Sequence, residues 1–155
     1  MIQEYKHPLL LNGPCFVHFE FLPYMASFCK ALEETGCKAW LTSSYRKTTN
    51  VPGAIVSPAK MSNHLIGHAI DCNIIDKNGT LWNSGLLKNP TGEVKEFINK
   101  VISKGIRWGG FFTPDKNGKT DPVHFDDGMN IHDPIHWQEI YDDIEKWLLQ
   151  GEDKN

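Results

Sequence analysis

The segment 69–75 constrains the fold of this chain most strongly, because apolar and polar residues alternate along it. One face would carry two isoleucines and a cysteine, and the other would carry the carboxylate of Asp71. A period of two is that of a β-strand with one buried face. The pattern therefore predicts a strand that ends near a hairpin turn at 76–79, with Asp71 on its polar face.

The remaining patterns predict a mixture of helices and short strands. Apolar residues recur at helical spacing over about 18–35, 91–104 and 133–150. In the last helix, the apolar face would be made by Ile140, Ile144, Trp147 and Leu148. Strands are expected over 38–46, 106–108 and 123–126, and a loop over 47–60. Helices segregated from a small antiparallel sheet predict an α+β fold, with the helices packed on one side of the sheet.

The length of 155 residues predicts a single domain spanning 1–155. A formal net charge of -3 and scattered basic residues disfavour a nucleic-acid partner. No apolar stretch is long enough to insert into a membrane, and the first residues lack the features of a secretion signal. We therefore expect a monomeric protein that is made in the cytoplasm. Its four cysteines lack CxxC spacing, which favours buried thiols over a disulfide framework or a metal site.

Two short pieces of sequence carry groups suited to a hydrolytic metal site. The segment 62–71 supplies His64 and Asp71, and fifty residues later the segment 121–125 supplies His124 and Asp121. Three protein ligands of the nitrogen and oxygen type leave one position of a tetrahedral zinc ion open for water. A carboxylate that does not bind the metal can then take a proton from that water.

Each of these residues alone is weak support for catalysis. A single histidine is more often a surface or core residue, and Asp121-Pro122 could simply begin a turn. Their joint occurrence in order is more specific: SSYR, then SxHxxGxAxD, then WGG, then DxxHF. Arg46 of the first motif could bind a substrate carboxylate or stabilise a developing oxyanion.

This order of motifs resembles the peptidoglycan-cleaving zinc peptidases of the D-alanyl-D-alanine carboxypeptidase and dipeptidase group, which includes phage L-alanyl-D-glutamate endopeptidases. The resemblance covers roughly residues 40–126 and implies the fold of that group, which hedgehog proteins share. It implies one Zn²⁺ per chain, bound by His64, Asp71 and His124. It further implies that Asp121 is the general base and that Arg46 assists substrate binding and transition-state stabilisation.

Other residues in the motifs have weaker or divided interpretations. The resemblance implies a place near the substrate for Ser62, and Trp108 could form either a cleft wall or an ordinary part of the core. We expect His68 to be an exposed bystander, and likewise His132 and His136 to be surface residues. The segment 115–121 lacks the distant glutamate of an EF-hand loop, so a hairpin turn is favoured over a calcium site.

These observations predict a zinc peptidase that hydrolyses an amide bond in the peptide stems of bacterial peptidoglycan. The resemblance implies a phage or prophage endolysin that reaches the wall after release from the cytoplasm. A D-alanyl-D-alanine dipeptidase or carboxypeptidase is an alternative within the same group. A non-catalytic metal-containing binding module is a further alternative, which the presence of Asp121 and Arg46 disfavours.

Overall fold

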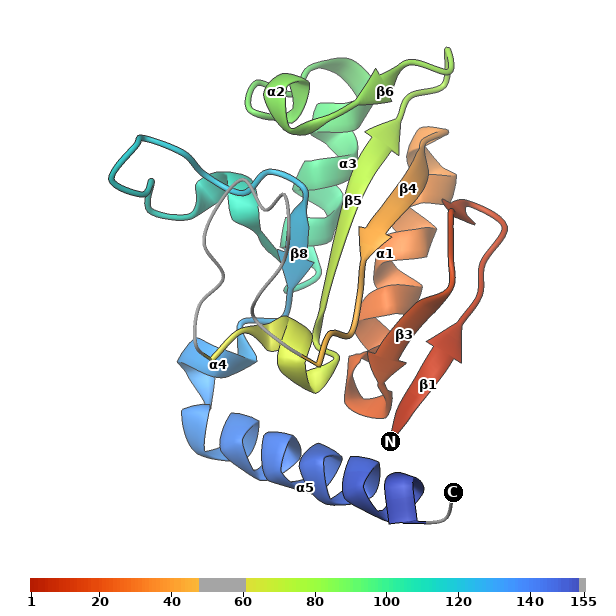
Figure 1. Ribbon diagram of the computed structural model, residues 1–155. Helices are drawn as coiled ribbons and strands as arrows, with labels where there is room; N and C mark the ends of the chain where they lie inside the picture. The colour runs from red at the N-terminus through yellow and green to blue at the C-terminus, as the bar shows by residue number, and fades with distance from the viewer. Residues whose placement is uncertain (48–60, 154–155) are drawn as a thin grey trace.

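A computed structural model describes residues 1–47 and 61–153 of the chain (Figure 1). The described part contains a six-stranded sheet in the order β2-β4-β5-β8-β7, with β6 paired to β5 as well. The strands are β2 (Leu10–Leu11), β4 (Lys38–Ser43), β5 (Ala69–Ile75), β6 (Leu81–Trp82), β7 (Arg107–Trp108) and β8 (His124–Asp126). A separate two-stranded sheet is formed by β1 (Ile2–Tyr5) and β3 (Cys15–His18).

The α+β class predicted from the sequence is confirmed, and β5 has the predicted bounds. The pairs of β5 with β4, β6 and β8 are antiparallel, as is the pair of β7 with β8. The pair of β2 with β4 is parallel, so the sheet is mixed at that edge. This pair was not predictable from the sequence, because a two-residue strand is too short to show a period.

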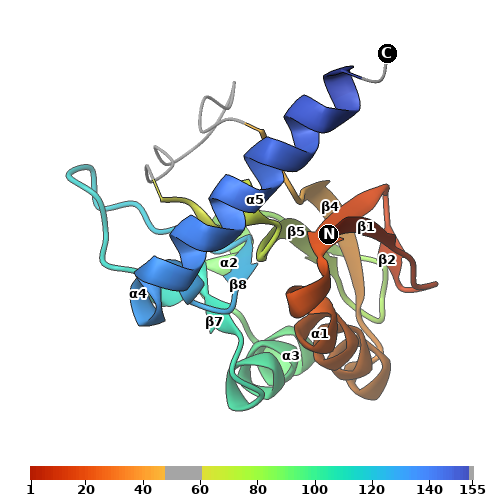
Figure 2. The same cartoon turned by 90° about the horizontal axis from the view of Figure 1, so that it is seen from below.

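Two long helices cover one face of the sheet, as Figure 2 shows from below. They are α1 (Leu22–Thr35), which follows the 3-10 helix η1 (Phe19–Phe21), and α3 (Gly92–Ser103). The short helix α2 (Ser84–Leu87) precedes α3. Phe28, Phe97 and Phe125 stack edge to face between these helices and β8. All four cysteines are buried and free, as predicted.

The C-terminal helix packs on a second apolar cluster, apart from the main core. Helix α5 (Pro134–Asp153) follows the short α4 (Met129–His132) and lies against the 3-10 helix η2 (Asn63–Ile66). A second apolar cluster fills this contact; its buried members are Leu65, Ile66, Trp137, Ile140 and Ile144. The prediction that Trp147 joins this face is wrong, because 44% of its surface is exposed near the end of the helix. Helix α5 therefore holds η2 from the side away from the main core.

The two predicted turns use the same chemistry. The Oδ1 atoms of Asp76 and Asp115 each accept two backbone N–H groups, from residues two and four positions later. The first turn joins β5 to β6, whereas the second closes a loop between the 3-10 helix η3 (Gly109–Phe111) and β8 that contains no strand. The loop predicted for 47–60 lies outside the described residues except for Lys47. None of the described helices is long and apolar enough to cross a bilayer.

Candidate active site

The register of the central sheet brings the two halves of the predicted site together. Asp71 on β5 lies opposite His124 on β8 and, across a register shift, opposite Ser43 on β4. In an antiparallel pair, side chains directly opposite each other share one face of the sheet. The apolar neighbours of Asp71 and His124, among them Phe125, point into the core instead. Alternation along both strands thus places a carboxylate beside an imidazole.

The third predicted residue, His64, reaches this point from η2. The side chain of Ser62 caps η2 by accepting the backbone N–H of His64. Gly67 then ends η2 in the left-handed conformation, with φ of 69°. A Cβ at this position would lie 2.5 Å from the backbone nitrogen of His18, so a side chain is excluded. Gly67 turns the chain directly from η2 into β5, and Ser62 positions His64.

His64, Asp71 and His124 converge on one point. Their donor atoms all lie within 4.8 Å of one another. Oδ1 of Asp71 is 3.1 Å from Nε2 of His64 and 3.1 Å from Nδ1 of His124. The two rings meet edge to face, with their centroids 5.1 Å apart. Both histidines are buried, and the side chain of Asp71 is 15% exposed.

The opposite nitrogens of the two rings have partners that fix their protons. Nδ1 of His64 lies 2.7 Å from the carbonyl oxygen of Ser44, so this nitrogen carries a proton and donates it. Nε2 of His124 likewise donates to Oδ2 of Asp126, at 2.6 Å. The nitrogen of each ring that faces Asp71 is then left with a lone pair in the neutral imidazole. This pattern of outer partners is common for metal-binding histidines in proteins.

Asp126 is a member of the site that the sequence analysis missed. Its carboxylate accepts two hydrogen bonds from Arg107, at 2.8 and 2.7 Å, and another from Nδ2 of Asn63, at 3.1 Å. The available signal was its position two residues after His124, because such neighbours in a strand share a face. The Asp126 side chain is only 1% exposed, so this network holds His124 from behind in a buried setting.

The charges of these groups are strongly coupled. Burial opposes ionisation of Asp71, but the adjacent His64 and His124 hold the pKa of its carboxyl far below its ordinary value. Burial would lower the pKa of His124, yet its bonds to Asp126 and Asp71 raise that pKa to about 10. Without a metal ion, His124 is therefore protonated at neutral pH and supplies the positive charge that Asp71 and Asp126 require.

Asp121 and Arg46 border the three converging residues. Oδ2 of Asp121 lies 3.9 Å from Nδ1 of His124, and an Arg46 guanidinium nitrogen lies 3.7 Å from Oδ2 of Asp71. Burial and the negative charge of Asp71 raise the pKa of Asp121, although the nearby positive groups oppose this. Within residues 1–47 and 61–153, the buried Nε of Arg46 has no hydrogen-bond partner. A guanidinium donor at this border suits an acceptor supplied by a substrate.

Trp108 lies behind this border and is only 4% exposed. Its Nε1 donates to the carbonyl oxygen of Pro122, 2.7 Å away, so the ring supports the backbone that carries Asp121. Gly109 fixes the same backbone from the other side, because its carbonyl accepts the N–H of Asp121. Of the two interpretations of Trp108 from sequence, the structure places it in the core.

The expectation for His68 is wrong, because this side chain is fully buried. Its Nδ1 donates to Oδ2 of Asp127, at 2.6 Å, and its Nε2 lies 3.1 Å from Nδ1 of His18. His136 is also more than a surface residue, since its Nε2 lies 3.0 Å from both carboxylate oxygens of Glu20. His132 is exposed, as expected. The partners of His68 and His136 come from distant parts of the sequence, which gave no sign of the contacts.

The three converging residues fit a metal ion by their donor chemistry. Two ring nitrogens with lone pairs face one carboxylate oxygen, and three acceptors in contact need a cation or an added proton between them. Two imidazoles and one carboxylate form a donor set that zinc prefers, and three such ligands leave a coordination position open. The site can therefore hold a divalent metal with Asp121 and Arg46 at its edge.

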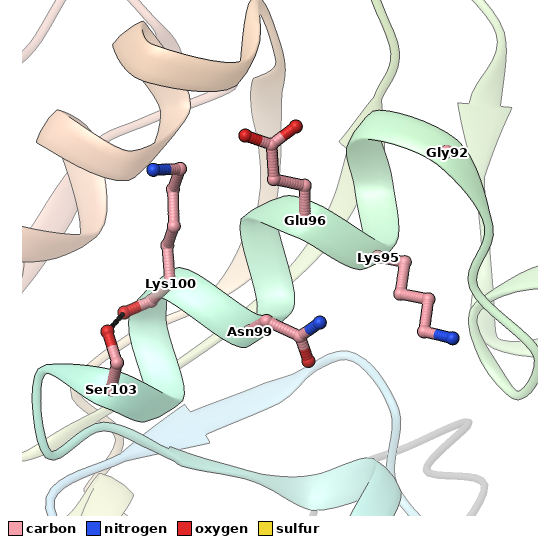
Figure 3. A pocket seen from close by; sticks show the side chains of 6 residues that line it. All are labelled: Gly92, Lys95, Glu96, Asn99, Lys100 and Ser103. Carbon is pink, nitrogen blue, oxygen red and sulfur yellow. Dashed lines mark hydrogen bonds between the residues drawn. The ribbon is translucent and has the colours of Figure 1, made fainter.

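A hollow of about 420 Å³ lies elsewhere, on the exposed side of α3. Figure 3 shows its side chains pointing in different directions; the lining residues are Gly92, Lys95, Glu96, Asn99, Lys100 and Ser103. No histidine or cysteine lines this hollow, and it offers no converging catalytic groups. The predicted catalytic residues converge at the sheet instead.

The comparison with family models agrees with this location. Residues 56–127, which include His64, Asp71, Asp121 and His124, match the family model described as D-alanyl-D-alanine carboxypeptidase. Among solved structures, the L-Ala D-Glu endopeptidase ChiX of Serratia marcescens is similar, with 17% identity and a TM-score of 0.44. That similarity covers 71% of this chain and 79% of ChiX. No curated protein matches the chain.

Proposed function

We propose that the chain is a zinc-dependent hydrolase of peptidoglycan stem peptides, because residues 56–127 match the family model described as D-alanyl-D-alanine carboxypeptidase. The observation that carries the proposal is the convergence of His64, Asp71 and His124 within 4.8 Å, with Asp121 and Arg46 beside them. His64 lies in η2 and Asp71 lies in β5, on either side of one turn, and His124 lies in β8. One Zn²⁺ per chain would be held there.

Zinc in such a site acts as a Lewis acid toward a carbonyl oxygen and lowers the pKa of water. Asp121 takes the proton of the attacking water, because its carboxylate lies beside the ligands and no described residue holds it in an ion pair closer than 3.9 Å. The same carboxyl then gives the proton to the leaving amine nitrogen as the amide C–N bond breaks. A raised pKa suits this exchange, because a general base works best when its pKa approaches the working pH.

Arg46 stabilises the negative charge that develops on the carbonyl oxygen of the scissile bond. Its contact with Asp71 fixes the guanidinium at the edge of the site, and none of the described residues accepts a hydrogen bond from its Nε. Burial lowers the pKa of Arg46, but the charges of Asp71 and Asp121 oppose this effect. The guanidinium therefore stays charged and acts as a preorganised donor.

The bond that we propose is the one between L-alanine and D-glutamate in the stem peptide, cleaved in the setting of phage lysis. Support comes from the ordered motifs SSYR, SxHxxGxAxD, WGG and DxxHF, which resemble those of a group that includes phage L-alanyl-D-glutamate endopeptidases. The alternative is removal of a terminal D-alanine, which is favoured by the description of the matching family model. Arg46 suits either substrate, since it could bind an oxyanion or a terminal carboxylate.

The products separate these two activities. Purified sacculi are incubated with zinc-loaded protein, and soluble fragments are analysed by mass spectrometry. Cleavage between L-alanine and D-glutamate creates a free amino group on D-glutamate and clears the suspension. Release of D-alanine without clearing would instead establish a carboxypeptidase. If neither product forms, a non-catalytic binding module is the remaining explanation.

A matched pair of variants tests the assigned base. Asp121→Asn should lower the turnover by about 10²- to 10⁴-fold while zinc content is unchanged. Asp115→Asn is the control, because Asp115 lies in the same loop and asparagine retains the Oδ1 acceptor that its turn uses. Equal turnover in Asp121→Asn and the wild type would show that another group is the base.

Light scattering of the wild type tests the expected monomer.

A further inference from the structure

A second group of metal-binding side chains lies on the other side of the η2–β5 turn. Nδ1 of His18, a carboxylate oxygen of Glu20 and Nε2 of His68 all lie within 4.8 Å of one another. His18 ends β3, Glu20 lies in η1, and His68 directly precedes β5. None of these residues belongs to the site proposed for catalysis.

The hydrogen bonds around His68 leave two acceptor nitrogens facing each other, one on His68 and one on His18. The carboxylate of Asp127 can only accept, so Nδ1 of His68 carries a proton and donates it over 2.6 Å. Nε2 of the neutral ring then holds a lone pair that faces Nδ1 of His18, 3.1 Å away. Nδ1 of His18 also holds a lone pair, because it faces the backbone N–H of Glu20 at 3.3 Å, a long hydrogen bond that a bound cation would replace. Two ring acceptors in contact require a cation between them or a second proton on His68.

The groups around this contact favour a metal cation. Oε2 of Glu20 lies 3.7 Å from Nε2 of His68 and 3.9 Å from Nδ1 of His18, so three donor atoms of metal-binding type face one another. Each of two ligands also has an outer partner: Asp127 holds His68, and His136 bonds both oxygens of Glu20. Hydrogen-bonded outer partners of this kind orient the ligands in metal sites.

A metal ion could reach this second cluster from solvent, and the fold holds its side chains in place. His18 and His68 are almost fully buried, whereas the side chains of Glu20 and His136 are 31% and 36% exposed, which leaves a path from solvent. The backbone N–H of His18 donates to the carbonyl of Gly67, at 2.9 Å, so the β3 end is tied to the turn that carries His68. The ligands are therefore preorganised by the fold.

We propose that His18, Glu20 and His68 bind a second divalent transition-metal ion, of the zinc type, which is separate from the catalytic ion. Two imidazoles and one carboxylate suit zinc, copper or nickel better than calcium or magnesium, which prefer sets of oxygen ligands. Through the bond of Glu20 to His136, the ion connects the N-terminal segment, the η2–β5 turn and the start of α5. Its role is to fasten these three elements.

Zinc titration of metal-free protein tests the proposal, with any affinity tag removed. Calorimetry and elemental analysis should give two ions per wild-type chain. His64→Gln should retain one ion through the second site, His68→Gln should retain one through the first, and the double variant should bind none. This design separates the two sites, because loss of the catalytic ion leaves the second ion countable.

Two milder variants protect the test against misfolding of His68→Gln. Glu20→Gln alters a partly exposed ligand and should also reduce the count to one ion, whereas His136→Gln should weaken the second ion by roughly tenfold. His132→Gln is the control, since His132 is exposed on α4, and it should still bind two ions. Circular dichroism verifies folding. A single wild-type ion that is lost in His64→Gln, or two ions in folded Glu20→Gln and His68→Gln, would overturn the proposal. A single wild-type ion that His64→Gln retains and His68→Gln loses would support it and contradict the catalytic site instead.

Discussion

Replacement of Asp126 by asparagine isolates the contribution of the carboxylate that holds His124 from behind. In the native protein this side chain accepts from His124 at 2.6 Å and from two nitrogens of Arg107 at 2.8 and 2.7 Å. Asparagine has nearly the same shape, but it lacks the negative charge and offers one acceptor oxygen instead of two. Asn63 and the backbone N–H of Gly128 also donate to this carboxylate, so it accepts five hydrogen bonds in all. The amide oxygen replaces one of the two carboxylate oxygens, and the donors that face the other oxygen lose their acceptor.

Two magnitudes follow from this geometry. Loss of an outer partner typically weakens metal binding by roughly 10- to 100-fold, or about 1.4–2.7 kcal/mol. Breaking a buried ion pair costs about 3–5 kcal/mol of unfolding free energy. The lower end applies here, because the side chain of Arg107 is 28% exposed and can be rehydrated. We therefore expect Asp126→Asn to lose about 3 kcal/mol of stability in the metal-free protein.

Competition with a zinc chelator measures the affinity, and urea unfolding of the metal-free protein measures the stability. Asp143→Asn is the matched control, because Asp143 is exposed on α5 and the same change of charge should leave both quantities unaltered. Affinity in Asp126→Asn equal to that of the control would refute the role of Asp126 in orienting His124. A loss of stability without a loss of affinity would assign Asp126 to the fold alone.

Four further predictions concern the same site. The pKa of His124 is raised to about 10 in the metal-free protein. Its stabilising contribution is therefore complete below about pH 6.5 and is lost as the pH rises through 10. Urea unfolding across that pH range would detect the loss. Zinc must displace this proton, so zinc affinity should rise about tenfold per unit between pH 6 and 8, and pH-independent binding would contradict the assignment. Gly109→Ala should lower turnover and cost about 1–3 kcal/mol of unfolding free energy, because its Cβ would collide with the carbonyl oxygen of Asp121. Gly85→Ala is the control and should be tolerated. Arg46→Gln should lower the turnover by about 10²- to 10³-fold with unchanged zinc affinity, and unchanged turnover would remove Arg46 from the mechanism.

The sequence predicted those parts of the site that local patterns encode. Alternation over 69–75 predicted the bounds of β5 and placed Asp71 on the polar face. The convergence of His124 with these residues required a pairing between distant strands. Only the ordered motifs made that pairing expected, because spacing within one segment contains no information about a partner fifty residues away.

Contacts between distant polar residues were not predictable in this way. The sequence suggested an exposed His68, because this residue lies on a loop-to-strand stretch where its spacing from His64 implies no common face. Asp127 is 59 residues away from His68, and His18 is 50 residues away. The edge strand β2 escaped prediction for a different reason, as two residues cannot display a period.

The two clusters are linked by one turn and by two adjacent carboxylates. Gly67 separates His64 from His68, so the residues before and after the turn serve different clusters. At the end of β8, Asp126 accepts from His124 of the first cluster, and its neighbour Asp127 accepts from His68 of the second. Successive side chains in extended backbone point to opposite sides, which explains how consecutive residues reach separate clusters. The register between β5 and β8 must therefore be fixed to the residue, since a slip by one position would exchange these partners and disrupt both clusters together.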